Sequence, residues 1–174
     1  MSRQNIDYRT QAEPKAMAGQ VPVFCSHDEI LEPSKLVPNP KNPNKHPDKQ
    51  VKLLAEIIKA QGWRQPITIS KRSGFIVKGH GRLMAAQLGG LGYVPVDYQN
   101  YASEAEEYAD LTADNRIAEL AEMDNIMLAE ILSDIDTGEL PLILSGYDED
   151  DLEGMLDAIA GADDAEPNDQ DDEV

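Results

Sequence analysis

Residues 73–91, SGFIVKGHGRLMAAQLGGL, constrain the fold of this chain more than any other stretch. Residues 75–77 predict the second strand of a hairpin, and residues 83–88 predict a helix that follows the glycine turn 79–82 without a linker. A strand that passes through such a turn into a helix exposes unpaired backbone N–H groups at the positive end of the helix dipole. The stretch therefore predicts a site for a phosphate or another anion.

Three residues of this turn carry the prediction. Gly79 and Gly81 can adopt positive φ angles and let a ligand approach the backbone, and Arg82 can bind phosphate oxygens through two N–H groups. A glycine pair also makes a tight strand-to-helix turn when no ligand binds. The local pattern alone leaves both interpretations open.

The length of 174 residues suits one domain with a proper core. No apolar run approaches the roughly 18 residues of a membrane span. Residues 1–10 lack a signal-peptide pattern, so we expect a soluble protein with no membrane contact. Cys25 is the only cysteine, which excludes an internal disulfide and cysteine-based metal clusters and favours the reducing cytoplasm.

Charge is distributed unevenly along the chain. The formal net charge of −18 divides into +1 for residues 1–19, +5 for residues 20–100 and −24 for residues 101–174. Because DNA binding requires clustered Lys and Arg, we expect only weak or indirect contact with DNA. A local basic cleft within residues 35–82 and an acidic face that docks on a basic partner are both open.

The first third of the chain is irregular in pattern. Residues 1–34 show no clear period, so we expect an arm with a short strand near residues 21–25. Residues 35–37 predict a short strand before PNPKNPNKHP, residues 38–47, a loop of four prolines and three asparagines. Its asparagines and His46 offer hydrogen-bonding groups on a rigid frame, as the rim of a small-ligand pocket requires.

Regular elements follow this loop. The apolar period within residues 51–58 predicts an amphipathic helix that ends before Gly62. Residues 66–70 and 75–77 predict the two strands of the hairpin, and residues 94–98 alternate as a further strand.

The acidic half predicts helices. A capping box at residues 103–106 opens a helix through about residue 113, where residues 114–116, Asp-Asn-Arg, interrupt the apolar run. Two more helices are predicted over residues 128–135 and 147–159. Residues 161–174 are acidic and nearly without apolar side chains, so we expect a disordered tail.

Taken in order, the segments LVPNPKNPNKHP, QPITIS, IVKGHGRLMAA, VPV and ADNR resemble the ParB-like nuclease domain of the ParB/sulfiredoxin fold. More narrowly, they are similar to its stand-alone versions, which are often phage-borne or fused to DNA methyltransferases. The resemblance covers about residues 35–125 and implies an α/β fold, a small mixed sheet with packed helices. Residues 1–34 are then an N-terminal arm, residues 126–160 an acidic helical extension and residues 161–174 the tail.

The resemblance also implies roles for individual residues. In the family the glycine turn binds nucleotide phosphates, so the implied nucleotide-binding residues are Gly79, His80, Gly81, Arg82, Arg116, Asn44, His46 and Gln65. The second motif implies that Asp114 and Asn115 hold Mg²⁺ beside a nucleoside triphosphate, CTP or ATP. A carboxylate and an amide oxygen are hard ligands of the kind that Mg²⁺ accepts.

The sequence departs from its relatives in three ways. Partition proteins usually carry two basic residues and a glutamate in the turn, where this chain has His80 and Gly81, so the nucleotide and its hydrolysis are unspecified. Sulfiredoxins carry their catalytic cysteine in the turn, whereas Cys25 lies upstream, which excludes that activity. Residues 117–160 contain no basic residue, which argues against a helix-turn-helix that binds DNA at specific sites.

Three side chains each have two interpretations. His80 can act as a general acid or base on a phosphate, or it can hydrogen-bond a backbone carbonyl. His46 can cap the following helix or line the pocket. Arg116 can face a phosphate or neutralise a nearby carboxylate such as Asp114.

Together these inferences predict a nucleotide-binding accessory protein, with or without nucleoside triphosphate hydrolysis, in phage or mobile-element DNA metabolism or modification. The expected partners are a nucleotide and a DNA methyltransferase or another phage DNA-processing protein, and the chain is compatible with a homodimer. Two alternatives are open: a non-enzymatic module that docks a basic partner through its acidic half, and a Mg²⁺-dependent nuclease.

Overall fold

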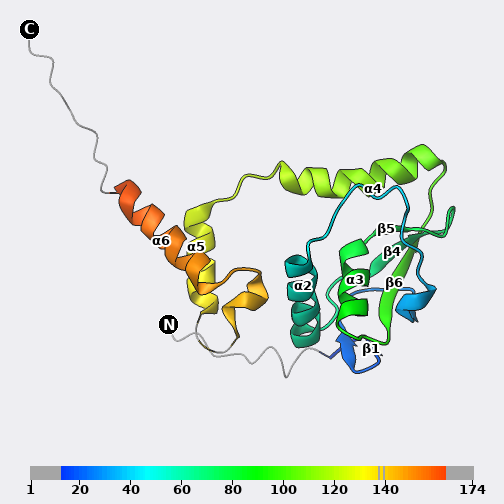
Figure 1. The fold of residues 1–174 in the computed structure, drawn as a ribbon, viewed down its shortest axis with the longest axis horizontal. Coiled ribbons are helices and arrows are strands. Elements are labelled where there is room, and N and C mark those ends of the chain that lie inside the picture. Colours follow the sequence, from blue (N-terminus) through cyan, green and yellow to red (C-terminus); the bar gives the residue numbers. More distant parts are fainter. Residues whose placement is uncertain (1–12, 137, 139, 164–174) are drawn as a thin grey trace, which may run out of the picture. The chain divides into compact units, whose positions relative to one another are not determined.

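The computed structural model describes residues 13–163 apart from residues 137 and 139. The chain divides into two compact units, Met1–Leu120 and Ala121–Val174, each with its own apolar core (Figure 1). The division lies slightly before the expected boundary at residue 125. Within the described residues no helix combines the length and the apolar character needed to cross a membrane.

A four-stranded mixed sheet forms the frame of the first unit. Its strands are β3 (Glu29–Leu31), β4 (Ile67–Ser70), β5 (Ile76–Lys78) and β6 (Val94–Gln99), in the order β3-β6-β4-β5. β4 and β5 form the predicted antiparallel hairpin, and β6 pairs in parallel with β4 and antiparallel with β3. β4 is buried along its whole length, as its β-branched residues and its inner position in the sheet require.

Residues 16–31 contain the short strand expected near residues 21–25 and two further strands that were not expected. β1 (Ala16–Ala18) and β2 (Val21–Val23) form a small antiparallel ribbon, and β3 is an edge strand of the main sheet. Val23 is fully buried and forms a bridge with Trp63. The two unexpected strands, β1 and β3, have three residues each, which is too short for a period of two to be recognised in the sequence.

The strand predicted over residues 35–37 is wrong. The chain forms the 3₁₀ turn η1 (Pro33–Lys35), and Val37 then makes an isolated bridge with Phe75. This bridge ties the beginning of loop 38–47 to the start of β5. The loop is therefore anchored beside the hairpin.

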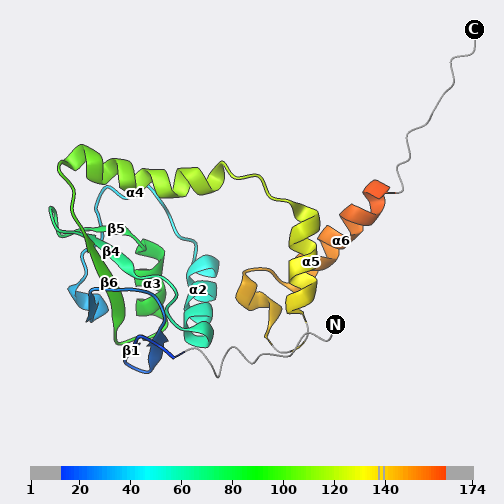
Figure 2. The same cartoon turned by 180° about the vertical axis from the view of Figure 1, so that it is seen from behind.

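Two helices complete the core of the first unit. α2 (Asp48–Gln61) and α3 (His80–Leu88) lie side by side, and α3 packs on β4 (Figures 1 and 2). The predicted helix before Gly62 is confirmed as α2. The apolar faces of the two helices and the sheet share one core, which includes Val51, Ala55, Ile58, Ile67, Ile76, Leu83, Ala85, Ala86, Val94 and Val96.

α4 (Glu104–Glu119) is longer than predicted. Its capping box is confirmed, because the Ser103 hydroxyl accepts a hydrogen bond from the Glu106 N–H at 3.1 Å. The expected interruption at residues 114–116 is wrong, since the helix continues through them. Asp, Asn and Arg adopt the helical conformation at a cost of only a few tenths of a kcal/mol, about 0.7 at most, so polar character alone does not end a helix.

The second unit consists of α5 (Asn125–Ile135), the 3₁₀ turn η2 (Leu142–Ser145) and α6 (Glu149–Asp163). Its core contains Ala129, Leu132, Leu142 and Leu152. Both predicted acidic helices are thus confirmed. The expected tail overlaps α6 at residues 161–163, and its remainder, residues 164–174, lies outside the described residues.

Candidate functional site

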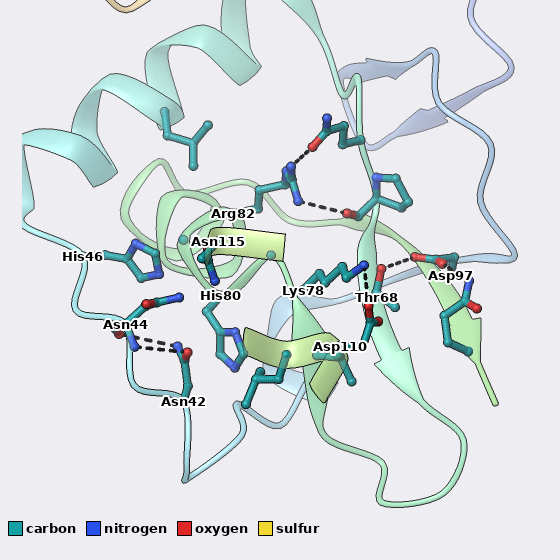
Figure 3. Close-up of a pocket in the computed structure, with 18 residues that line it drawn as sticks. Asn42, Asn44, His46, Thr68, Lys78, His80, Arg82, Asp97, Asp110 and Asn115 are labelled. Atoms are coloured by element: carbon teal, nitrogen blue, oxygen red, sulfur yellow. Dashed lines mark hydrogen bonds and ion pairs between the residues drawn. The ribbon is translucent and has the colours of Figure 1, made fainter. Parts of the chain in front are cut away.

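A polar cavity of about 740 Å³ lies in the first unit around the glycine turn (Figure 3). Its wall comes from loop 38–47, α2, the beginning of β4, β5, turn 79–82, the end of β6 and α4. Small-ligand pockets have volumes of about 300–1,000 Å³. Eight of the predicted site residues line it: Asn44, His46, Gln65, Gly79, His80, Gly81, Arg82 and Asn115.

Gly79 is the N-cap of α3 and has the left-handed backbone conformation, with φ 95° and ψ 25°. A Cβ here would lie 3.2 Å from Arg82 Nη1 and 3.3 Å from the Ile67 Cα. The Arg82 guanidinium donates hydrogen bonds to the Pro66 carbonyl at 3.3 Å and to the Gln65 side-chain oxygen. Glycine is therefore required here both for the turn and for the room that Arg82 occupies.

Gly81 makes room for His46. A Cβ at this position would lie 3.2 Å from His46 Cε1 and 3.3 Å from its Nδ1. His46 Nδ1 lies 3.1 Å from the Gln50 Oε1, and α2 has no side-chain cap. His46 therefore lines the pocket beside the start of α3. The sequence suggested that Gly81 lets a ligand approach, whereas the close neighbour in the structure is this imidazole.

His80 joins the turn to loop 38–47. Its Nε2 accepts a hydrogen bond from the Asn39 N–H at 3.2 Å. Burial, with a smaller contribution from the nearby His46, lowers the pKa of His80 from 6.5 to about 4. The ring is neutral at pH 7 and carries its proton on Nδ1. These contacts support a structural role, through a backbone amide instead of the expected carbonyl, and a catalytic role for His80 stays a prediction.

The asparagines of loop 38–47 shape the loop as well as the pocket. Asn39 is 4% exposed, and its Oδ1 accepts a hydrogen bond from the Lys41 N–H at 2.9 Å. Asn42 Oδ1 similarly accepts from the Asn44 N–H at 3.3 Å. Such turns, closed by a side chain two residues earlier, hold a proline-rich loop in one conformation. The loop thus presents Asn42 and Asn44 to the cavity on a rigid frame.

A charged pair lies on the wall formed by β5 and α4. The Lys78 Nζ lies 3.0 Å from Asp110 Oδ1, and the Tyr101 hydroxyl donates to Asp110 Oδ2 at 2.8 Å. Burial opposes the charged carboxylate, but the contacts with Lys78 and Tyr101 outweigh it and hold the pKa of Asp110 below its ordinary value. Asp110 therefore stays ionised beside Lys78.

A second carboxylate lies at the β4–β6 junction. The parallel register places Thr68 beside Asp97, and the Thr68 hydroxyl donates to Asp97 Oδ1 at 2.8 Å. The Gln99 side-chain amide donates to Asp97 Oδ2 at 2.9 Å. Both carboxylate oxygens of Asp97 therefore accept hydrogen bonds from neighbouring side chains in the wall of the cavity.

A buried carboxylate fixes α4 in place. The side chain of Glu107 is 0% exposed and accepts hydrogen bonds from the hydroxyls of Ser70 at 2.7 Å and Ser73 at 2.6 Å. Arg72 Nε lies 3.0 Å from the same carboxylate. Burial opposes ionisation, yet the two hydroxyls and Arg72 hold the pKa of Glu107 below its ordinary value. Glu107 therefore joins α4, one wall of the cavity, to the turn of the hairpin.

The second predicted motif is only partly at the cavity. Asn115 lines it, while the side chain of Asp114 lies outside the described part of the structure. Arg116 is not one of the described lining residues; its Nη1 lies 3.2 Å from the Glu119 carboxylate, and its side chain is 64% exposed. Among residues 13–163, apart from the masked positions, no group of three or more His, Cys, Asp or Glu is placed to hold a metal ion.

Several residues of the site were missed from the sequence. Lys78 directly precedes the glycine turn, and Asp97 follows the buried part of β6, so both positions carried a usable signal. Asp110 lies one helical turn before Asp114. Glu107 carried no signal, because one more glutamate in an acidic helix is indistinguishable by pattern from its exposed neighbours.

The amino-acid sequence matches a known family over most of the first unit. The ParB N-terminal domain family matches residues 10–115, which is more than half of the chain. The ParB-like nuclease domain-containing protein YnaK of Escherichia coli (strain K12) is 43% identical over 61 residues, or 35% of this chain and 69% of that protein.

The fold is similar to a solved partition protein. The C-terminally truncated chromosome-partitioning protein ParB from Caulobacter crescentus, complexed with CTP-gamma-S, superposes with a TM-score of 0.61. The two chains are 19% identical, and the match covers 76% of this chain and 78% of that one. The mixed α/β fold expected from the sequence is confirmed by this likeness.

Proposed function

Because the chain belongs to the ParB N-terminal domain family, we propose that the cavity binds a nucleoside triphosphate with its phosphates at the N-terminus of α3. One observation carries the proposal: the start of α3, Lys78 and Arg82 converge on the same cavity. The Caulobacter ParB with a similar fold is complexed with CTP-gamma-S, which supports a nucleotide as the ligand.

We expect different parts of the wall to bind the phosphates and the nucleoside. The first N–H groups of α3 have no partner within the helix and favour an anion at this end. Arg82, held by Gln65 and the Pro66 carbonyl, keeps its guanidinium beside the turn. The side-chain amides of Asn42, Asn44, Gln65, Gln99 and Asn115 all line the cavity and offer donors and acceptors to a base or sugar.

We further propose that Mg²⁺ accompanies the nucleotide, with Asp114 and Asn115 as its protein ligands. The charges of Lys78 and Arg82 in the wall are balanced by those of Asp97 and Asp110, so a triphosphate needs an additional cation. Mg²⁺ commonly takes one or two protein ligands and completes its coordination with phosphates and water. Asn115 fits this pattern, because it lines the cavity and the described residues include no group of three or more His, Cys, Asp or Glu placed to hold a metal ion.

The biological setting belongs to the same proposal. The sequence motifs resemble stand-alone phage or methyltransferase-associated proteins, so we propose a role in phage or mobile-element DNA metabolism beside a DNA-processing partner such as a methyltransferase. Nucleotide binding is the activity that the cavity supports best. Hydrolysis has weaker support, because the Nε2 of His80, the candidate base, already accepts the Asn39 N–H.

Thermal unfolding with each nucleoside triphosphate, with and without Mg²⁺, tests the proposal. A ligand at about 100 times its Kd stabilises the folded state by about 2.7 kcal/mol, so the melting temperature should rise for the preferred nucleotide. Arg82→Ala should remove most of the shift. The matched control is Arg64→Ala, which loses the same charge from an exposed side chain over the Phe24 ring, outside the cavity wall. If no nucleotide shifts the melting temperature at about millimolar concentration, the proposal is wrong.

Calorimetric titration separates the metal from the phosphates. Asp114→Ala should lose the part of the affinity that depends on Mg²⁺, whereas Arg82→Ala should lose affinity with and without the metal. Equal losses for Asp114→Ala with Mg²⁺ and with EDTA would mean that the residue holds no metal. Arg116→Ala tests the predicted phosphate contact, which its exposed pairing with Glu119 does not favour.

A further inference from the structure

The second unit carries an apolar groove between its two long helices. Ile126 and Ala129 of α5 and Leu156 and Ile159 of α6 line a hollow of about 490 Å³. A second hollow of about 330 Å³, lined by Leu152 and Leu156, adjoins it at the shared Leu156. Ile126 is 58% exposed and Leu156 47%, so the unit leaves large apolar side chains open along this groove.

The groove is lined by one sign of charge. Its ionisable residues are all acidic: Glu130, Asp134, Asp136, Glu149, Glu153 and Asp157. Residues 117–174 contain no Lys, Arg or His, so the unit supplies no cation to neutralise them. An apolar floor between uncompensated carboxylates attracts a ligand that is apolar along its centre and positive along its edges.

We propose that this groove binds a basic amphipathic helix of a partner protein. The apolar stripe of that helix would cover Ile126, Leu156 and Ile159, and its flanking Lys and Arg would face the carboxylates. Helix-in-groove recognition uses anchors at i, i+3, i+4 and i+7, which form one apolar stripe that can contact the apolar side chains of the groove.

The charge of the groove argues against the other occupants. A second copy of the chain would bring the same carboxylates against these, and like charges facing one another weaken association. Nucleic acid and anionic lipid surfaces carry the same negative sign. A basic peptide is the ligand for which both the apolar floor and the acidic rim are favourable.

The structure provides matched variants for a test. Ile126 lies in the groove, whereas Met127 and Ile131 of the same helix are 58% and 49% exposed and do not line it. None of these three belongs to the buried core of the unit, which contains Ala129, Leu132, Leu142 and Leu152. Replacing them by Gln should therefore leave the unit folded, which circular dichroism can check.

The probe is a fluorescein-labelled synthetic helix of about 15 residues, with Leu at helical spacing and Lys at the remaining positions. Fluorescence anisotropy against the full chain measures its affinity at about 0.15 M salt and at higher salt. A scrambled peptide of the same composition has the same charge but no apolar stripe. We expect the amphipathic peptide to bind, with an affinity that falls as salt rises, and the scrambled peptide to bind at least about tenfold more weakly, a difference of about 1.4 kcal/mol.

Single substitutions test whether the peptide binds in the groove. Ile126→Gln and Leu156→Gln should each reduce the affinity by about tenfold, and Met127→Gln and Ile131→Gln should change it by less than about twofold. Replacing Glu130, Asp134 and Asp157 together by their amides should weaken the dependence on salt. Equal binding of the scrambled peptide, equal losses at Ile126 and Ile131, or no binding at all would each overturn the proposal. Because the nucleotide cavity lies in the first unit, its own test is unaffected by these outcomes.

Discussion

At the residue scale, burial and the nearby His46 hold the pKa of His80 at about 4, below its ordinary 6.5. Unfolding restores the ordinary value, so between these two pKa values the unfolded chain binds more protons than the folded chain. The stability that a neutral His80 contributes is therefore complete above the unfolded pKa and is lost as the pH falls towards the folded one. We predict that His80→Gln flattens the pH dependence of the free energy of unfolding in this window.

Urea denaturation at several pH values measures this dependence. His27→Gln is the control, because the His27 Nδ1 lies 3.1 Å from the Cys25 carbonyl oxygen and the residue does not line the cavity. Titration of the imidazole protons by NMR gives the pKa of His80 directly. A midpoint for His80 close to 6.5 would contradict the buried, neutral ring that joins the turn to the asparagine loop.

At the scale of elements, Glu107 is the buried side chain that joins α4 to the turn of the hairpin. Glu107→Ala would leave Ser70, Ser73 and Arg72 without their common acceptor, and we predict a loss of about 3 kcal/mol in the free energy of unfolding. Glu107→Gln should lose less, because its amide oxygen can still accept from a hydroxyl. Since folding lowers the pKa of Glu107 from 4.5, its contribution is present above that pH and is lost as the pH falls through the folded pKa.

Glu119→Gln is the matched control for α4. Its exposed pairing with Arg116 should be worth about 0–1 kcal/mol, so chemical denaturation should separate the two glutamates clearly. Similar small losses at both positions would mean that the network around Glu107 does not hold the helix to the hairpin.

At the scale of the whole molecule, the two units have separate cores, and every described residue that lines the cavity lies between Asn42 and Asn115. We predict that a fragment of residues 1–120 unfolds cooperatively and keeps the nucleotide-dependent rise in melting temperature. Differential scanning fluorimetry on the fragment and on the full chain makes the comparison. A fragment that folds but shows no rise would mean that the acidic half contributes to the site.

The sequence by itself determined the elements whose signals are local. These signals lie between residues that are close in the sequence. They are the period of 3.6 residues in α2, the alternation and turn of the β4–β5 hairpin, and the capping box of α4. The glycine turn was found for the same reason, because a strand, two glycines and a helix adjoin in the sequence. The family resemblance added the order of these motifs, which correctly indicated the fold.

Only the tertiary structure decided which of these residues meet. Glu107 with Ser70, Lys78 with Asp110 and Gly81 with His46 are each separated by more than thirty residues, and no local period records such a contact. The short strands β2 and β3 likewise pair with distant segments, since Val23 forms a bridge with Trp63 and β3 pairs with β6. Local propensities are worth a few tenths of a kcal/mol, up to about 1, per residue, whereas burial and long-range pairing are worth several times more. The glycine turn and the asparagine loop of the site were therefore visible in the sequence, whereas the geometry of the site and the contacts of Glu107 were set by packing.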